Sequence, residues 1–153
     1  MRLELNRRTD YAIRACLRLA TAGDRPLSSR RIAAETDVPE RFLARVLVEL
    51  VGAGIVEARL GRTGGYRLRQ APRELTLLEL VEAVEGPSTS LRCVLRQRGC
   101  EPGEPCAIHP VWAAAQKGIL DVLHDTTLAD VLLAEQAIDP ASDGAMLKER
   151  AAS

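Results

Sequence analysis

The sequence predicts a mainly α-helical fold with one small β-hairpin and a long additional helix. Apolar residues recur at helical spacing in several segments, and a Gly-rich turn joins two short β-prone segments in the middle of the chain. Three of the four cysteines cluster in a later stretch, which Gly and Pro keep from being a regular helix or strand. The 153 residues, 46% of them apolar, fit one compact domain with an extension.

Charges are divided unequally along the chain, although its formal net charge is zero. Residues 1–70 contain 14 Arg and 8 acidic residues, a net charge of +6, whereas residues 71–153 contain 7 basic and 13 acidic residues, a net charge of −6. Arg is the basic residue best suited to phosphate and to guanine. The first half is therefore expected to meet a polyanion.

The first helix is expected from about residue 7 to residue 22, because Tyr11, Ala15 and Leu19 recur at helical spacing. Asp10 lies in its first turn, where a carboxylate stabilises the helix N-terminus. Cys16 lies beside the apolar stripe and is isolated in sequence from the other cysteines. It is interpreted as a small core residue and not as a ligand.

Two shorter helices are expected next, separated by a tight turn. Ser28 and Ser29 form an N-capping signal for a helix that ends at about Thr36. Pro39 is well placed at the first position of the following helix, which is expected to run to about Val51. Two short helices joined in this way indicate a helix-turn-helix.

The second of these helices has two different faces. Arg41 and Arg45, four residues apart, project from one of them. The other face is apolar and is formed by Phe42, Leu43, Val46, Leu47 and Leu50. In a helix-turn-helix, the second helix enters the major groove of DNA with its N-terminal residues at the base edges.

A β-hairpin is expected directly after this helix, with strands at about residues 55–59 and 66–69. Its turn is rich in glycine, which lets the backbone approach a phosphate or a minor groove closely, and Arg62 supplies positive charge at the tip. A hairpin in this place is a wing. The predicted fold is therefore a winged helix-turn-helix domain followed by a long dimerisation helix.

The C-terminal half supplies two further helical regions. A short helix is expected at residues 75–86, and a long one begins near Pro110. The apolar stripe of the long helix has nothing in its own chain to pack on, and it consists of Val111, Trp112, Ala115, Ile119, Val122 and Leu123. The same helix of a second copy would cover it, which predicts a homodimer that reads a pseudo-palindromic operator in double-stranded DNA.

The chain is accordingly divided into four parts. Residues 1–86 form the DNA-binding domain, and residues 87–109 form a cysteine-rich loop that binds a cluster. Residues 110–133 form the dimerisation helix, with a final helical turn or two at 127–133. Residues 134–153 are polar and alanine-rich, and they are expected to be a flexible tail.

The cysteine-rich stretch contains Cys93, Cys100 and Cys106, separated by six and five residues. Thiolates favour iron–sulfur clusters, zinc or copper, and an irregular loop can wrap them around one centre. His109, three residues after Cys106, or an oxygen from elsewhere would be a fourth ligand. The alternative from spacing alone is a set of free thiols, or a disulfide with one thiol left over.

Candidate DNA contacts come from the helix-turn-helix and the wing. Two arginines of the second helix are candidates for contacts with base edges or flanking phosphates. A serine and two further arginines are candidates for contacts with phosphates. The tip of the wing is a candidate for close approach of the backbone to DNA. In chain order, these residues are Ser29, Arg31, Arg41, Arg45, Arg59, Arg62 and Gly64.

This order of parts resembles the IscR/NsrR family of winged-helix transcription regulators over about residues 1–133. The resemblance rests on residues 9–14, the wing at 61–66, residues 77–86, the three clustered cysteines and residues 127–132. It implies a homodimeric, DNA-binding repressor or dual regulator. It also implies a 2Fe-2S or 4Fe-4S cluster, held by the three cysteines and one ligand that is not a cysteine.

The resemblance leaves two residues as the fourth ligand. His109 matches the histidine that follows the last cysteine in the cluster-biogenesis regulators of the family, and Trp112 adds to this local likeness. Asp10 matches the aspartate in the N-terminal helix of the family's nitric-oxide sensors. Such a carboxylate would reach the loop of the other subunit and tie the cluster to the dimer interface.

Three competing hypotheses have different consequences. A structural zinc in a Cys3His site would hold the loop permanently. A cluster-free regulator would sense through thiol oxidation or through a partner protein. A thiol oxidoreductase is disfavoured, because the chain contains no C-x-x-C motif, no Ser/His/Asp constellation and no phosphate loop.

A cytoplasmic protein without membrane association is expected. The chain opens with charged residues where a signal peptide needs an apolar run, and none of its apolar runs approaches membrane-spanning length. In the cytoplasm, structural disulfides are disfavoured and clustered cysteines more often bind metal.

Overall fold

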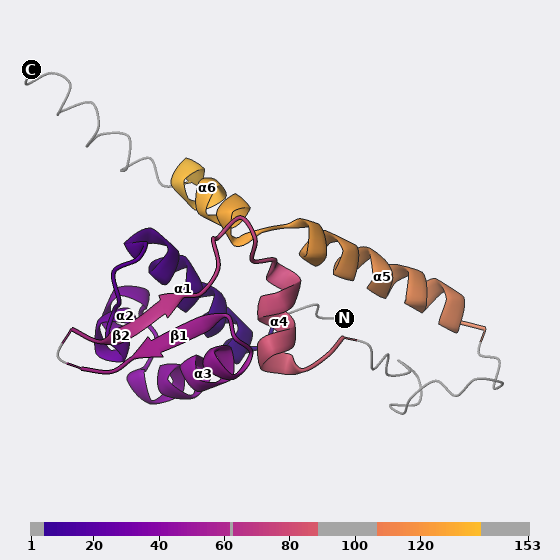
Figure 1. Cartoon of the computed structure of the whole chain (residues 1–153). Coiled ribbons are helices and arrows are strands. Elements are labelled where there is room, and N and C mark those ends of the chain that lie inside the picture. Colours follow the sequence, from indigo (N-terminus) through magenta and orange to yellow (C-terminus); the bar gives the residue numbers. More distant parts are fainter. Residues whose placement is uncertain (1–4, 62, 89–106, 139–153) are drawn as a thin grey trace, which may run out of the picture.

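Figure 1 shows the arrangement of the chain in a computed structural model that describes residues 5–61, 63–88 and 107–138. The elements of these residues follow in the order α1 (Arg7–Ala22), α2 (Ser29–Thr36), α3 (Glu40–Gly52), β1 (Val56–Arg59), β2 (Gly65–Leu68), α4 (Leu77–Glu85), α5 (His109–Asp125) and α6 (Leu128–Ile138). The predicted mainly helical fold with a hairpin wing is confirmed.

Helix α1 lies at the centre of the domain and packs against α2, α3, α4 and β2. Asn6 caps its N-terminus by accepting the backbone N–H of Thr9 at 3.0 Å. Its most deeply buried residues include Ala12, Ala15 and Cys16, each with 0% exposure. Small side chains allow neighbouring helices to approach closely. Burial raises the pKa of the Cys16 thiol to about 12, and the prediction that Cys16 is a core residue is confirmed.

Helices α2 and α3 pack on α1 and on each other as the predicted helix-turn-helix. Ser28 caps α2, because its side chain accepts the backbone N–H of Arg31 at 3.3 Å. Asp37 ends α2 in the left-handed conformation, with φ of 55°, and thereby turns the chain toward α3. The buried face of α3 consists of Leu43, Val46, Leu47 and Leu50.

Two details of α3 differ from the prediction. Pro39 is the N-cap and not the first helical residue, since its backbone is still extended, with φ of −60° and ψ of 127°. Phe42 is 40% exposed and not fully part of the apolar face. It lies at the margin of that face, where its ring centroid is 6.4 Å from that of Tyr11 on α1.

The hairpin is anchored to the segment between α1 and α2. Strands β1 and β2 pair in antiparallel register, from Val56 opposite Leu68 to Arg59 opposite Gly65. Leu27 and Tyr66 then exchange two backbone hydrogen bonds, of 3.0 and 2.8 Å. This bridge holds the wing against the helix-turn-helix.

Helix α4 begins with a capping box, in which Thr76 and Glu79 each accept the other's backbone N–H. It buries Leu80 and Val84 against the domain. Its start is also joined to the α5–α6 connection, because Leu77 donates its N–H to the carbonyl of Thr126 at 2.9 Å. The last two helices are therefore attached to the domain at this point.

Helix α5 extends away from the domain, as Figure 1 shows, and none of its residues is buried. Leu128, the first residue of α6, returns to the core with 0% exposure. Helix α6 continues to Ile138, five residues beyond the final turns expected at 127–133. The added residues are mostly strong helix formers, Ala, Glu and Gln, which explains the extension. Residues 139–153 of the expected tail lie outside the described residues.

Gly65→Ala is predicted to lower the free energy of unfolding by about 1–3 kcal/mol. Gly65 has a φ of +150°, and a Cβ there would lie 2.5 Å from the carbonyl oxygen of Leu27, so the bridge to the wing would have to separate. Urea unfolding measures the loss. Gly52→Ala is the control, because a Cβ there meets nothing within 4 Å. Equal stability of the two variants would contradict this account of the wing anchor.

Candidate nucleic-acid interface and cysteine loop

The exposed face of α3 carries unneutralised positive charge. Arg41 and Arg45 both lie on the side opposite the buried stripe, as predicted. Neither pairs with a carboxylate within residues 5–61, 63–88 and 107–138. The Arg41 guanidinium lies 4.6 Å from the ring centroid of Phe42, which supports it while leaving its hydrogen-bond donors free. This face can therefore donate hydrogen bonds to phosphates or to guanine.

The arginine that was predicted on α2 is partly neutralised. Arg31 Nε lies 2.8 Å from Glu35 Oε1, and Glu35 also pairs with Arg18 of α1. Hydrogen bonds from Arg31 and then from Arg18 lower the pKa of Glu35. The spacing of four residues between Arg31 and Glu35 already indicates such a pair in the sequence.

Arg30 on α2 is a further candidate for a phosphate contact that the sequence pattern did not single out. It is exposed and has no ion pair among the described residues. Ser29, which was predicted to contact phosphate, is the first residue of α2, whereas its neighbour Ser28 forms the cap. The first N–H groups of a helix lack acceptors within the helix, so this end of α2 still offers donors to a phosphate.

The base of the wing contains a second shared carboxylate. Glu57 Oε1 accepts from Arg59 Nε at 3.0 Å and also pairs with Arg67 across the hairpin. Hydrogen bonds from Arg67 and then from Arg59 lower the pKa of Glu57. Arg67 also pairs with Asp24 at 3.3 Å, so the two arginines at the base of the wing are balanced by two carboxylates.

Gly64 is required by the turn itself. A Cβ at this position would lie 2.2 Å from the carbonyl oxygen of Arg59, and its N–H donates to the carbonyl of Gly61 at 3.0 Å. The turn thus accounts for the glycine without a DNA contact. Arg62, the predicted wing-tip contact, lies outside the described residues.

Three of the candidate metal ligands lie outside the described residues, and two lie within them. Cys93, Cys100 and Cys106 lie outside these residues, and His109 is the first residue of α5. Within the part of the chain that the structure describes, no three or more His, Cys, Asp or Glu side chains gather where they could hold a metal ion.

Asp10 is paired within its own helix. Its Oδ1 accepts from Arg14 Nε at 2.9 Å, one turn further along α1, and this carboxylate raises the pKa of Arg14. The pair is exposed and not enclosed in the core. Exposed ion pairs are weak, so this carboxylate can exchange its partner at little cost.

The end of α4, which precedes the cysteine loop in sequence, is tied to α1 and α3. Arg8 donates to the carbonyl of Val84, and the Thr9 hydroxyl donates to the carboxylate of Glu85, at the end of α4. Arg8 also lies 3.6 Å from Glu49 of α3. These contacts join the end of α4 to α1 and α3.

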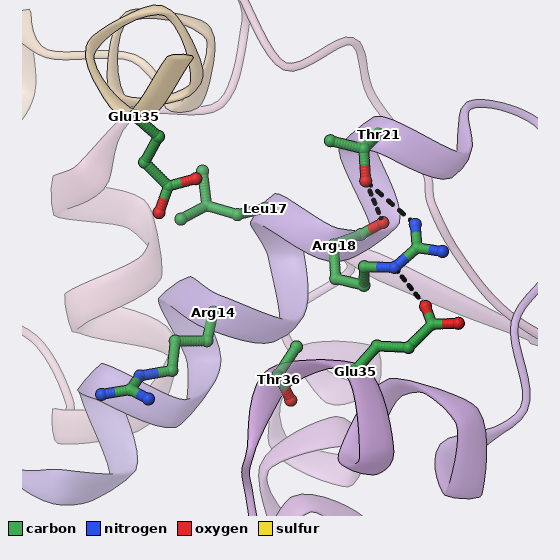
Figure 2. A pocket seen from close by; sticks show the side chains of 7 residues that line it. All are labelled: Arg14, Leu17, Arg18, Thr21, Glu35, Thr36 and Glu135. Carbon is green, nitrogen blue, oxygen red and sulfur yellow. Dashed lines mark hydrogen bonds and ion pairs between the residues drawn. The ribbon is translucent and has the colours of Figure 1, made fainter. Parts of the chain in front are cut away.

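A cavity of about 230 Å³ lies between α1, α2 and α6. Figure 2 shows Glu135 of α6 on one side of it, pointing toward Leu17, and the Arg18–Glu35 ion pair on the other. The last helix therefore lies beside α1, with α2 on the other side of the cavity. None of the described helices is both long enough and apolar enough to span a membrane.

The helix-turn-helix, the exposed arginines of α3 and the anchored wing define a winged-helix DNA-binding protein. The chain belongs to the Rrf2 family, whose model is described as an iron-dependent transcriptional regulator and matches residues 5–134. The protein is therefore a DNA-binding transcription regulator, of a family whose members are generally not enzymes. The resemblance to regulators of the IscR/NsrR type is confirmed.

Individual relatives support the same assignment. The transcriptional repressor NsrR of Streptomyces coelicolor is 31% identical over 134 residues, which cover 86% of this chain and 90% of that protein. IscR of T. potens has a TM-score of 0.73 with 25% identity, over 90% of this chain and 91% of that one. CymR, the global cysteine regulator of B. subtilis, has a TM-score of 0.71 with 26% identity, over 86% and 97%.

Arg45→Ala is predicted to weaken binding to duplex DNA and to reduce the slope of log affinity against log salt by about 1, because Arg45 is free to neutralise a phosphate. Arg31→Ala is the matched control, since Arg31 is already paired with Glu35. Fluorescence anisotropy over a salt series measures both. An equal loss of DNA affinity in the two variants would show that the ion pair with Glu35 does not keep Arg31 from contacting DNA.

Proposed function

We propose that this chain is a homodimeric, sequence-specific transcription repressor whose DNA affinity is switched by an iron–sulfur cluster. The cluster would be a 2Fe-2S or a 4Fe-4S centre that responds to nitric oxide, redox state or iron and cluster supply in the cytoplasm. The observation that carries the proposal is the placement of three cysteines between α4 and α5, where the loop joins the DNA-binding domain to the exposed long helix.

The donor set fits an iron–sulfur cluster. Cys93, Cys100 and Cys106 would supply thiolates, the usual ligands of such clusters. His109 stands at the exposed N-terminus of α5, directly after the loop, and Asp10 stands exposed on α1. Cys16 does not qualify, because its buried thiol has a pKa of about 12 and stays protonated. The family's description as iron-dependent supports iron over zinc.

Dimerisation would cover the exposed apolar face of α5. Val111, Ile119 and Val122 on this helix are 70%, 43% and 65% exposed. A helix that keeps such side chains in water needs a partner surface, and a second copy of the same helix gives an isologous contact. Two winged domains in such a dimer would meet the two half-sites of a pseudo-palindromic operator.

The contacts at the end of α4 would couple the state of the cluster to DNA binding. The residues that precede the loop are held by Arg8 and Thr9 of α1, and Arg8 also lies beside Glu49 of α3. A change in the loop would act on the position of α3 through these side chains. The cluster, when bound, supplies a centre whose ligation responds to oxidants and nitric oxide, and these contacts supply the mechanical coupling.

A second candidate function is a cluster-free regulator that senses through its thiols. The structural likeness to CymR, named as a cysteine regulator, favours this alternative over a structural zinc site. The same three cysteines would then undergo oxidation instead of ligating iron. A cluster-binding protein and a cluster-free thiol sensor would differ in colour, in iron content and in their response to chelators.

Anaerobic purification is predicted to give a coloured dimer with one cluster per subunit, observed by absorption spectroscopy and native mass spectrometry. Air or nitric oxide would bleach the visible bands. A colourless dimer with one zinc per subunit would contradict the switch and leave DNA binding intact. A colourless, metal-free dimer after cluster reconstitution would support thiol sensing.

The same measurement is predicted to identify the fourth ligand. Loss or a spectral shift of the cluster in His109→Ala, but not in His124→Ala, would assign the histidine. The same result in Asp10→Ala, but not in Arg14→Ala, would assign the aspartate, because Arg14→Ala removes the same ion pair and keeps the carboxylate. An unchanged cluster in both His109→Ala and Asp10→Ala would contradict the proposed ligand set.

A further inference from the structure

The exposed apolar side chains of the DNA-binding domain are concentrated on its DNA-facing elements. Among the described residues up to 88, the exposed large apolar residues are Leu5, Phe42, Val48, Val51 and Leu60. Three of them lie on α3, and Leu60 lies in the turn of the wing. Elsewhere in the described part of the domain, Leu5 is the remaining large apolar residue in this exposed group, so the distribution favours α3 and the wing.

Val48 lies at the centre of the exposed face of α3. It follows Arg41 by seven residues and Arg45 by three, so the three side chains share one side of the helix. Val48 is 69% exposed. Ala44, also exposed, precedes it by one turn on the flank of the same face. The face that carries the free arginines thus also carries an apolar strip.

The other exposed apolar residues of α3 have structural explanations. Phe42 lies beside the Tyr11 ring and beneath the Arg41 guanidinium. Val51 occupies the last turn, next to Gly52, where the helix ends. Val48 is in the helix interior, where a β-branched residue in water is a poorer helix former than Lys, Glu or Gln. Its presence there is not explained by the stability of the helix.

The major groove offers one apolar group, the C5-methyl of thymine, and small apolar side chains contact it. We propose that Val48, together with Ala44, reads a thymine methyl in the operator and is a specificity-determining residue. The inference rests on the DNA binding proposed for α3. The flanking Arg41 and Arg45 match the negative charge of DNA, so this face fits a major groove better than it fits an apolar protein partner.

The position of the thymine follows from the helix geometry. Seven residues of α-helix span about 10 Å, and base pairs are stacked about 3.4 Å apart. The thymine would therefore lie within about three base pairs of the base or phosphate that Arg41 contacts. A half-site should contain it at one fixed position.

The test uses the full-length protein and a duplex selected from a random-sequence pool. Each thymine of one half-site is replaced singly by deoxyuridine, which removes only the methyl group. We expect one replacement to weaken wild-type binding about fourfold, as expected for the loss of one buried methyl group. Val48→Ser removes both methyl groups of the side chain, and the variant should lose this dependence. Val51→Ser is the matched control and should keep it.

The coupling between protein and DNA substitutions decides the inference. A selected duplex whose affinity is unchanged by every uracil replacement would contradict the thymine contact and leave the regulator function standing. The same fourfold loss in Val48→Ser would show that the thymine methyl acts without Val48. Failure to select any duplex would contradict the proposed function as well. Unchanged DNA specificity in Val48→Ser, with loss of binding to another protein, would assign the strip to a protein partner.

Discussion

The packing of α1 against its neighbours is the contact on which the rest of the structure depends. Ala12, Ala15 and Cys16 are small enough to let α2, α3 and α4 lie close to one helix axis, and all three are completely buried. A larger side chain at any of them would force these helices apart. One helix therefore sets both the orientation of α3 and the position of α4, after which the cysteine loop follows in sequence.

Acidic residues then decide which arginines remain available to DNA. Glu35 engages Arg31, and Glu57 engages Arg59 and Arg67, whereas Arg41 and Arg45 keep their donors. Part of the net charge of +6 in the first 70 residues therefore lies on the exposed face of α3, as Arg41 and Arg45. A local positive face of this kind explains how a chain with zero net charge can attract a polyanion.

The order and approximate positions of the elements could be predicted because they have local signals, such as the Ser28 cap and the glycines of the wing. The bridge between Leu27 and Tyr66 could not, since it joins distant segments through backbone atoms that any residue offers. The exposure of Phe42 likewise depends on how closely Tyr11 approaches it.

Some features of the candidate site could likewise be predicted from the sequence, and others could not. The exposure of Arg41 and Arg45 could be predicted from helical spacing alone, whereas the ion pair between Arg67 and Glu57 depends on the cross-strand register. The clustered cysteines, the most specific signal of the sequence, fall outside the described residues. Their relation to Asp10 and His109 is a question of three-dimensional proximity, and for Asp10 it involves a second chain. Spacing in one sequence carries no information on that distance.

The central claim is that the state of the cysteine loop sets the affinity for DNA. The most direct test is the dissociation constant for one selected operator duplex, measured at fixed salt with the cluster-loaded dimer and with the same dimer after cluster removal under reducing, anaerobic conditions. The account predicts a difference of about fivefold or more, the range in which coupled sites in proteins usually fall. Equal affinities of the two forms, both dimeric and both folded, would contradict it.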